Sequence, residues 1–346
     1  MQLAYKNTKD TVIIGIESSC DDTSVAILKN GNILANITAG QKIHEEYGGV
    51  VPELASRAHQ QNLIPVVQIA LKKSGIQWSD FSAIAYTRGP GLLGSLLVGS
   101  SFAKGLSLAL NTPLLEVHHM KAHILAHFIK DYPEQPVPDF PFLCLTVSGG
   151  HTQLVKVNSA VDMQILGQTI DDAAGEAFDK AAKILGLTYP GGPLIDEFAQ
   201  KGDEQKFNFT IPKIEGLNYS FSGLKTQFLY FIQAETTKNK HFIEENLADI
   251  CASYQKTIID FLMVKLKRAA KEHRLRDVAI AGGVSANMGL RNRLNNLAKE
   301  QGWRVFIPTF EYCTDNAAMI AMAGYFQFLE NDIGKIENPP LARWNM

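Results

Sequence analysis

Residues 142–157, FLCLTVSGGHTQLVKV, repeat a pattern that occurs first near the start of the chain. They predict an apolar strand, a small polar turn with two glycines, and a second strand with alternating character. Residues 11–17 (TVIIGIE) predict a buried strand rich in β-branched side chains, and residues 24–28 predict a second strand leading into the hairpin signal Asn30-Gly31. This recurrence indicates an internal duplication, with one copy in each of two α/β lobes.

The clearest linker lies between these two copies. Residues 131–141 (DYPEQPVPDFP) contain four prolines, a composition typical of a semi-rigid connection. We therefore expect a first lobe over residues 11–133 and a second lobe over residues 140–314. A final helix is predicted over residues 315–330, and we expect it to pack back on the first lobe.

The bulk composition describes a folded protein with an ample core. The chain has 346 residues, of which 46% are hydrophobic and 20% charged, and a net charge of −2. That charge gives no bulk attraction to nucleic acid. No apolar run is expected to span a membrane, and the N-terminus lacks the apolar region of a signal peptide. The four scattered cysteines predict a reducing, cytoplasmic environment without a disulfide framework.

Four of the nine histidines fall within residues 116–127, EVHHMKAHILAH. This segment lacks Gly and Pro and predicts a helix that ends near Lys130. Helical spacing places His119, His123 and His127 on one face, and imidazoles four residues apart can bind one divalent metal. Surface or capping histidines would need no metal, but the density of this run favours the metal.

A metal at this helix needs a further ligand, which we expect to be a carboxylate. Asp315, in the loop before the last helix, is the best placed, although it could serve only as the N-cap of that helix. No Glu follows His119, so the general base of the HExxH zinc proteases is missing.

Several turns predict binding of a phosphate or a nucleotide. After the first strand, Glu17, Ser18 and Asp22 could surround a phosphate and its metal, although a polar hairpin without a ligand has the same signature. The glycine-rich residues 88–95 could form an anion site or only a tight connection between a strand and a helix. Residues 282–287 (GGVSAN) follow a predicted strand and would admit a nucleoside.

Two polar residues of the second lobe have competing roles. Asn287 could bind a ligand through its amide or simply cap the helix predicted over residues 288–300. Asp179 lies too far inside the helix predicted over residues 171–185 for capping to explain it.

The remaining elements are predicted from hydrophobic patterns. The basic residues towards the end of the longest helix are best explained by the helix dipole and a solvated face. We expect residues 208–225 to form a loop region. Helices are predicted over residues 52–73, 96–110 and 243–274, and strands over residues 81–87, 277–281 and 304–308.

Seven sequence blocks occur in a fixed order along the chain. They are GIESSCDDT (residues 15–23), HHMxxH (118–123), VSGGHT (147–152), DAAGEAFDK (172–180), YPGGP (189–193), AGGVSAN (281–287) and TDNAAM (314–319). Each block alone is weakly specific, whereas the ordered set covers nearly the whole chain. With this set the chain resembles the TsaD family of tRNA threonylcarbamoyladenosine transferases, which has archaeal and eukaryotic relatives.

The resemblance implies an actin-like (ASKHA) fold with two lobes and a central nucleotide cleft. It implies that His119, His123 and Asp315 bind one divalent metal, with iron favoured and zinc possible. One departure is visible, since Lys121 and Ala122 stand where many bacterial members have Glu and Gly; these are not ligand positions. The resemblance assigns the nucleotide to Thr146, Val147, Ser148, Gly149, Gly150, Asp179, Gly192, Asn287 and also Asp196.

The implied reaction transfers threonylcarbamoyl from threonylcarbamoyl-AMP to N6 of the adenosine at position 37, 3′ of the anticodon, in tRNAs that read codons beginning with A. The implied partners are a related actin-like subunit (TsaB-like) and a P-loop ATPase (TsaE-like), with no membrane. Two rival hypotheses are a glycoprotease-like metalloprotease and a non-catalytic ATP-binding module of the same fold. Three nucleotide-type turns argue against the first, and the histidine–aspartate set argues against the second.

Overall fold

The computed structural model describes residues 10–41, 44, 47–211 and 213–346. The chain forms two compact units. Unit 1 comprises Met1–Gln41, Val50–Gln135 and Asp315–Met346, and unit 2 comprises Lys42–Gly49 and Pro136–Thr314. The last helix therefore belongs to the first unit, although it follows the second one in the sequence.

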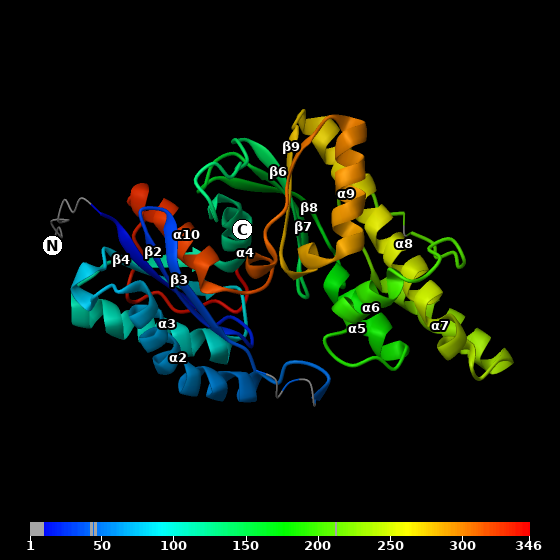
Figure 1. Cartoon of the computed structure of the whole chain (residues 1–346), viewed down its shortest axis with the longest axis horizontal. Coiled ribbons are helices and arrows are strands. Elements are labelled where there is room, and N and C mark those ends of the chain that lie inside the picture. Colours follow the sequence, from blue (N-terminus) through cyan, green and yellow to red (C-terminus); the bar gives the residue numbers. More distant parts are fainter. Residues whose placement is uncertain (1–9, 42–43, 45–46, 212) are drawn as a thin grey trace. The chain divides into compact units, whose positions relative to one another are not determined.

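Unit 1 contains a five-stranded sheet in the order β3-β2-β1-β4-β5 (Figure 1). The central strand β1 pairs antiparallel with β2 and parallel with β4. Strand β5 lies at the edge of the sheet and pairs only with β4 among the described strands. The strands are β1 (Val12–Glu17), β2 (Thr23–Lys29), β3 (Asn32–Ala39), β4 (Ala83–Gly89) and β5 (Leu114–His118).

Successive residues of β1 face two different layers of helices, one on each side of the sheet. Ile14 and Ile16 belong to a core that includes residues of α2 (Pro52–Ser74) and α3 (Leu93–Leu110). Gly15 points the other way, because successive residues of a strand face opposite sides. A Cβ there would lie 2.6 Å from the Ala317 carbonyl oxygen of α10 (Ala317–Leu329), so only glycine admits this helix.

The sequence predicted one helix from residue 116 through the histidine-rich segment, and this prediction is wrong. Residues up to His118 complete β5, and α4 spans only His119–Leu125, followed by a 3₁₀ turn over Ala126–Phe128. The run of apolar and β-compatible residues beginning at Leu114 pairs with β4, which overrides local helix propensity. A further 3₁₀ turn covers Trp78–Asp80.

Unit 2 contains a second five-stranded sheet, in the order β10-β9-β6-β7-β8. Its central strand β6 pairs antiparallel with β7 and parallel with β9, as β1 does with β2 and β4. This correspondence confirms the predicted duplication. The strands are β6 (Phe142–Val147), β7 (Thr152–Val157), β8 (Met163–Gln168), β9 (Asp277–Ala281) and β10 (Arg304–Phe306).

The helices of unit 2 bury an aromatic core around Tyr254 of α8. The Tyr254 ring contacts the rings of Phe178, Phe209 and Phe228. The expected loop over residues 208–225 gives way at Ser222 to α7, which the sequence analysis missed. The helices are α5 (Ala174–Ile184), α6 (Gly191–Ala199), α7 (Ser222–Lys238), α8 (Phe242–His273) and α9 (Met288–Gln301), with 3₁₀ turns at Gly283–Ala286 and Phe310–Tyr312.

The place of Lys265 in a basic run predicted a solvated face, but the structure buries this residue. It is 6% exposed, and its ammonium donates to the carbonyl oxygens of Ile214 and Gly216, both at 2.6 Å. Burial lowers its pKa, and the nearby Arg268 adds to this shift. This lysine therefore pins the preceding loop to α8.

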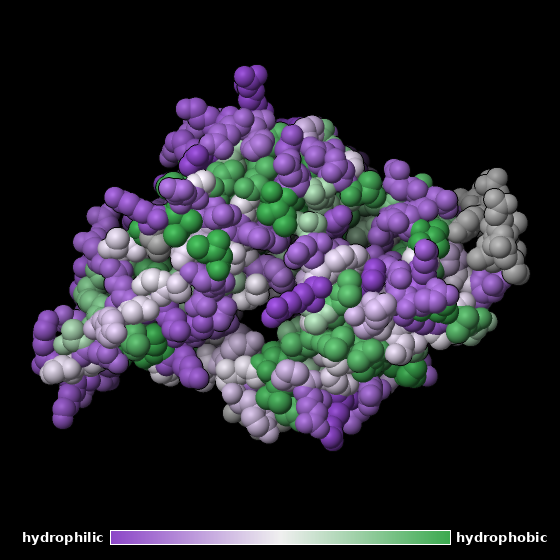
Figure 2. Space-filling view, turned by 180° about the vertical axis from the view of Figure 1, so that it is seen from behind, coloured by the Kyte–Doolittle hydropathy of each residue, from purple (hydrophilic) through white to green (hydrophobic). Residues whose placement is uncertain are grey.

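Helix α3 corrects the expectation that no segment is long and apolar enough to cross a membrane. Its 18 residues pass that test on length and composition alone. One such helix is weak evidence of a span, because core helices pass the same test, and α3 buries Leu96, Gly99 and Ala103 in unit 1. The face drawn in Figure 2 is largely hydrophilic, with hydrophobic residues in small groups.

Candidate metal centre and nucleotide pocket

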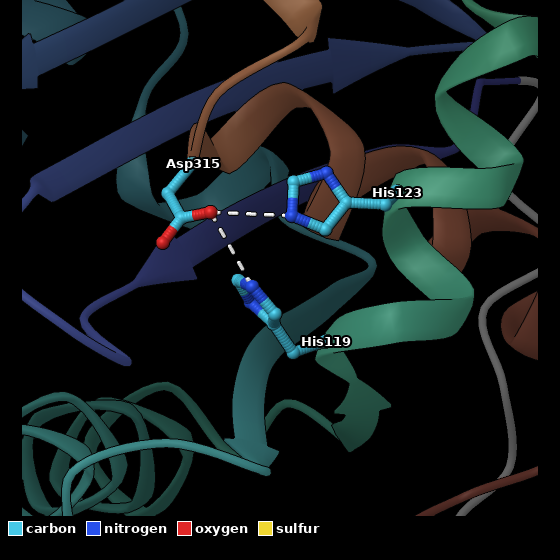
Figure 3. A group of neighbouring side chains, drawn as sticks. All are labelled: His119, His123 and Asp315. Atoms are coloured by element: carbon cyan, nitrogen blue, oxygen red, sulfur yellow. Dashed lines mark hydrogen bonds and ion pairs between the residues drawn. The ribbon is translucent and has the colours of Figure 1, made fainter. Parts of the chain in front are cut away.

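Unit 1 brings His119, His123 and Asp315 together (Figure 3). One ligand atom from each lies within 4.8 Å of the others. Asp315 Oδ1 lies 3.3 Å from His119 Nε2 and 3.2 Å from His123 Nε2. Both histidines come from α4, where a spacing of four residues puts them on one face, and their rings meet edge to face.

Asp315 is free to face the histidines because its neighbour caps the last helix. Asn316 is the N-cap of α10, and its side chain accepts from the Met319 N–H. The alternative that Asp315 acts only as the N-cap is therefore wrong. His127, the third histidine of the predicted stripe, lies in the 3₁₀ turn beyond α4 and outside this group.

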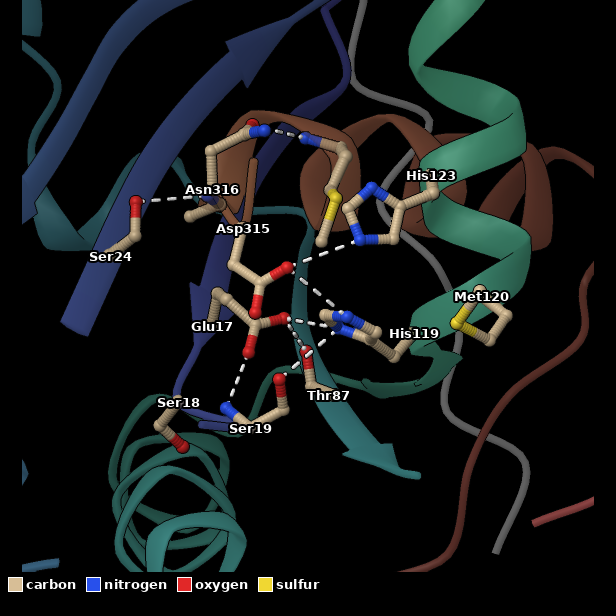
Figure 4. Close-up of polar contacts among 12 residues, drawn as sticks. Glu17, Ser18, Ser19, Ser24, Thr87, His119, Met120, His123, Asp315 and Asn316 are labelled. Atoms are coloured by element: carbon tan, nitrogen blue, oxygen red, sulfur yellow. Dashed lines mark hydrogen bonds and ion pairs between the residues drawn. The ribbon is translucent and has the colours of Figure 1, made fainter. Parts of the chain in front are cut away.

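Glu17 orients His119 by contacting Nδ1, the ring nitrogen that does not face Asp315 (Figure 4). Its carboxylate is fully buried and accepts from the Ser19 N–H, from the Thr87 hydroxyl at 2.6 Å and from His119 Nδ1 at 3.1 Å. Because a carboxylate only accepts, Nδ1 must carry the proton of the neutral ring, which leaves His119 Nε2 bare towards Asp315. Ser19 Oγ also lies 3.3 Å from His119 Nδ1.

The electrostatics of this group are those of a cation site. Burial disfavours the charged form of His119, but Asp315 and Glu17 outweigh it and raise its pKa well above the usual value. Burial would likewise raise the pKa values of Asp315 and Glu17, yet His119 holds both below their usual range. Without a metal, a proton on His119 thus supplies the positive charge.

The residues fit a single metal ion. Two imidazole nitrogens and one carboxylate oxygen form the donor set of many catalytic zinc and iron sites, in which other positions stay open for substrate. The carboxylate behind His119 matches the partner that metal-bound histidines usually have. His123 Nδ1 is buried and has no hydrogen-bond partner among the described residues, so its Nε2 alone carries the polar interaction.

The residues predicted to surround a phosphate in unit 1 have different surroundings. Glu17 is engaged by His119, and the Ser18 hydroxyl donates to the Ser95 carbonyl oxygen at 3.0 Å. Asp22 is a half-buried acid whose pKa is raised to about 7 by partial burial and by the charge of Asp315. Sequence reasoning missed that Glu17 contacts His119, because 102 residues separate them.

Unit 2 holds a pocket with a volume of about 340 Å³. Among the predicted residues, Gly149, Asp179, Gly192, Asp196 and Asn287 line it, whereas Thr146, Val147, Ser148 and Gly150 are not part of the lining. Gly283, Val284 and Ala286 of the predicted turn over residues 282–287 also line it. The lining residues that the prediction did not include are Gly175, Phe178, Pro190, Pro193 and Thr314.

The carboxylates of this pocket are held by helix N-termini. Asp179 Oδ1 accepts from the backbone N–H groups of Gly191 and Gly192, where α6 begins, at 2.9 and 3.1 Å. Burial raises the pKa of Asp179, although these two donors oppose the shift. Sequence reasoning missed that Asp179 caps α6, the next helix in the chain.

The start of α9 is organised by Asp196 and Asn287. Asp196 accepts from the Met288 and Gly289 N–H groups at 2.8 and 3.3 Å, and from the Gln255 amide at 3.0 Å. The Asn287 side chain accepts from the Leu290 N–H and donates to Gln255. The N-cap role of Asn287 is thus confirmed.

The fold class of the whole chain is shown by solved structures. The chain aligns with the Thermococcus kodakarensis HypF structure at a TM-score of 0.63, covering 93% of this chain and 48% of HypF at 16% identity. The activator of 2-hydroxyisocaproyl-CoA dehydratase from Clostridium difficile, solved with bound ADPNP, aligns at 0.51 over 95% and 100%, also at 16% identity. Both are actin-like α/β proteins, and at this identity they show the fold alone.

Sequence relatives narrow this class to one family. The family model for tRNA N6-adenosine threonylcarbamoyltransferase (TsaD) matches residues 32–322. Enzymes of that name from Christiangramia forsetii and Porphyromonas gingivalis are 62% and 57% identical, covering 96% and 97% of this chain and 97% and 98% of theirs. The chain therefore belongs to the TsaD family.

Proposed function

We propose that this protein transfers a threonylcarbamoyl group to N6 of the adenosine at position 37, 3′ of the anticodon, in tRNAs that read codons beginning with A. The 62% identity to a curated threonylcarbamoyltransferase over nearly the full length of both chains carries the proposal. The donor is threonylcarbamoyl-AMP, and the reaction takes place in the cytoplasm.

His119, His123 and Asp315 hold one divalent metal in this proposal, with Fe²⁺ favoured and Zn²⁺ as the alternative. When bound, the metal supplies Lewis acidity towards the oxygens of the donor's carbamoyl or carboxylate group. Glu17 keeps His119 oriented towards it. The nucleophile is the exocyclic amine of the RNA, so no side chain need act as one.

The adenylate part of the donor occupies the pocket of unit 2. Its size suits part of a nucleotide, and glycines and prolines line it, so that a ligand can approach the backbone closely. Gly149, Asp179, Gly192, Asp196 and Asn287 shape this pocket, and Gly149 lies just beyond the end of β6. The phosphate role predicted for Glu17, Ser18 and Asp22 is not part of this proposal, because Glu17 is engaged by His119 and the Ser18 hydroxyl by the Ser95 carbonyl oxygen.

The direct test is a single-turnover assay with threonylcarbamoyl-AMP and unmodified tRNA, followed by nucleoside analysis. Threonylcarbamoyladenosine should form with the native chain and not with His119→Ala. A tRNA whose position 37 is not adenosine is the matched control. Hydrolysis of a peptide substrate without any modified nucleoside would favour the metalloprotease alternative, against which Met120, in place of Glu after His119, already argues.

We further propose that the chain needs partners for efficient turnover. Its net charge is −2, whereas tRNA affinity comes largely from neutralised phosphates. The partners are an actin-like subunit (TsaB-like) and a P-loop ATPase (TsaE-like). Turnover with and without these proteins tests the proposal, and full turnover by the lone chain would contradict it.

A further inference from the structure

We infer that the C-terminal tail, residues 333–344, fixes the start of α4, and that His118 is the positioning residue through which the tail holds the metal-binding histidines. The inference rests on the metal centre proposed above. His118 belongs to the HHMxxH block, and the tail follows the last predicted helix. Neither belongs to the group of metal ligands.

The tail first follows the edge strand β5. The Gly334 N–H donates to the Leu114 carbonyl oxygen at 2.9 Å. The half-buried Glu116 carboxylate accepts from the Lys335 N–H at 3.0 Å and from the Asn338 side chain at 2.9 Å. The tail therefore covers part of an edge that would otherwise present unpaired backbone groups.

The tail then crosses the loop that follows β4. The Leu341 N–H donates to the Arg88 carbonyl oxygen at 2.8 Å, and the Gly91 N–H donates to the Ala342 carbonyl oxygen at 3.2 Å. A Cβ at Gly89 would collide with the Leu341 carbonyl oxygen, so the close approach requires glycine at this position. The Arg88 guanidinium lies 5.0 Å from the centre of the Trp344 ring.

The path ends on His118, which is 6% exposed. Its Nε2 lies 3.0 Å from the Trp344 carbonyl oxygen, and its Nδ1 accepts from the Met120 N–H at 3.2 Å. A carbonyl can only accept and an amide N–H can only donate. The two partners together assign one neutral tautomer, with the proton on Nε2.

This arrangement makes the tail part of a helix cap. His118 is the N-cap of α4, a helix of only seven residues. In so short a helix, more than half of the N–H groups lack an intrahelical acceptor, so the cap has a large share in fixing where the helix begins. His119 is the first residue of α4, and its Nε2 must lie within bonding distance of the metal. A shift at the N-cap therefore moves a metal ligand directly.

A pair of truncations separates this role from general stabilisation. A chain ending at Arg343 loses the Trp344 carbonyl and ring, whereas a chain ending at Asn345 keeps both. We expect Co²⁺ affinity, measured by titration of its visible absorption, to fall about tenfold in the first chain and to match the full chain in the second. Hydrogen exchange of residues 114–128, measured on the metal-free protein, should quicken only in the first.

Substitutions at His118 test the connection itself. His118→Ala should weaken Co²⁺ binding as the shorter truncation does, and the two changes together should be no worse than His118→Ala alone, because they break one path. His118→Asn can cap α4 without the tail, so truncation should have no further effect in that variant. If the shorter chain does not fold, the contrast between His118→Ala and His118→Asn in the full chain decides.

Equal Co²⁺ affinity for the chains ending at Arg343 and Asn345 would overturn the inference, even if their unfolding temperatures differed. The inference would also be overturned if the losses of Co²⁺ affinity caused by the truncation and by His118→Ala multiplied in the combined variant. Absence of Co²⁺ binding by the full chain would remove the metal centre itself.

Discussion

The carboxylates of the two units have different kinds of hydrogen-bond partner. In unit 1, Glu17 and Asp315 face the imidazoles of α4. In unit 2, Asp179 and Asp196 face backbone N–H groups at the starts of α6 and α9. The sheets have corresponding strand orders, so the difference arises in the connections. Unit 1 needs a cation to balance its acids, whereas unit 2 has already satisfied its acids with helix N-termini.

This difference suggests a division of labour within a duplicated fold. A buried group of acids and imidazoles attracts a metal, and a pocket whose acids are already bonded can accept a nucleotide.

The largest effect is expected from His119→Ala. It removes a proposed metal ligand and leaves the buried Glu17 and the half-buried Asp315 without the imidazole that lies between them. Metal should be absent by elemental analysis, and transfer should fall by more than about 100-fold, since even partners of ligands are worth 10–100-fold. His127→Ala is the matched control and should keep its metal; metal loss in both variants would contradict the assignment.

Glu17→Gln should weaken metal binding by about 10–100-fold. A glutamine amide would donate to His119 Nδ1 and so move the ring proton to Nε2, the atom that faces Asp315. Thr87→Val removes one donor to Glu17 and should have a smaller effect. Calorimetric metal titration measures both, and equal affinity in Glu17→Gln and the native chain would exclude the orienting role.

Gly149→Val should reduce AMP affinity by about tenfold or more, because the side chain would fill the pocket of unit 2. A Cβ at Gly149 meets no atom within 4 Å, so we expect the variant to fold normally. Gly150→Val is the neighbouring control outside the lining. Unchanged AMP affinity with unchanged metal content would place the nucleotide elsewhere.

Metal affinity should rise with pH by about tenfold per unit around neutrality, since binding must displace the proton that Asp315 and Glu17 hold on His119 against the cost of burial. The rise should flatten above the raised pKa. The stability of the metal-free protein should change with pH in the opposite direction and fall as pH rises. The contribution of charged His119 to stability is complete below about pH 6.5 and is lost as pH rises through the folded-state pKa of His119. A pH-independent affinity would mean that His119 is neutral without metal.

The smallest effect is expected from Asp196→Ala. Removing the acceptor of three donors at the start of α9 should lower the free energy of unfolding by about 1–3 kcal/mol. Metal content should not change. Urea denaturation measures the loss, and metal loss in this variant would show that the two sites are not independent.

Much of this organisation could be predicted from the sequence. Hydrophobic alternation and turn residues were enough to find β1, β2, β6 and β7, and their recurrence revealed the duplication. The pair His119 and His123 follows from helical spacing. The boundary between β5 and α4 at His118 could not be predicted in this way, because the pairing of β5 with β4 decides where the strand ends. Nor could the contacts of Glu17 and Asp179 be predicted, since a single sequence does not tell which distant groups the fold brings together.

Anomalous diffraction from crystals of the full chain grown with Co²⁺ would test the central claim most directly. We predict one peak in unit 1, about 2.0–2.2 Å from Nε2 of His119 and of His123 and from Asp315 Oδ1. Data collected on His119→Ala crystals should lack it. A peak bound by other residues, or a native crystal without a peak at these three side chains, would contradict the account.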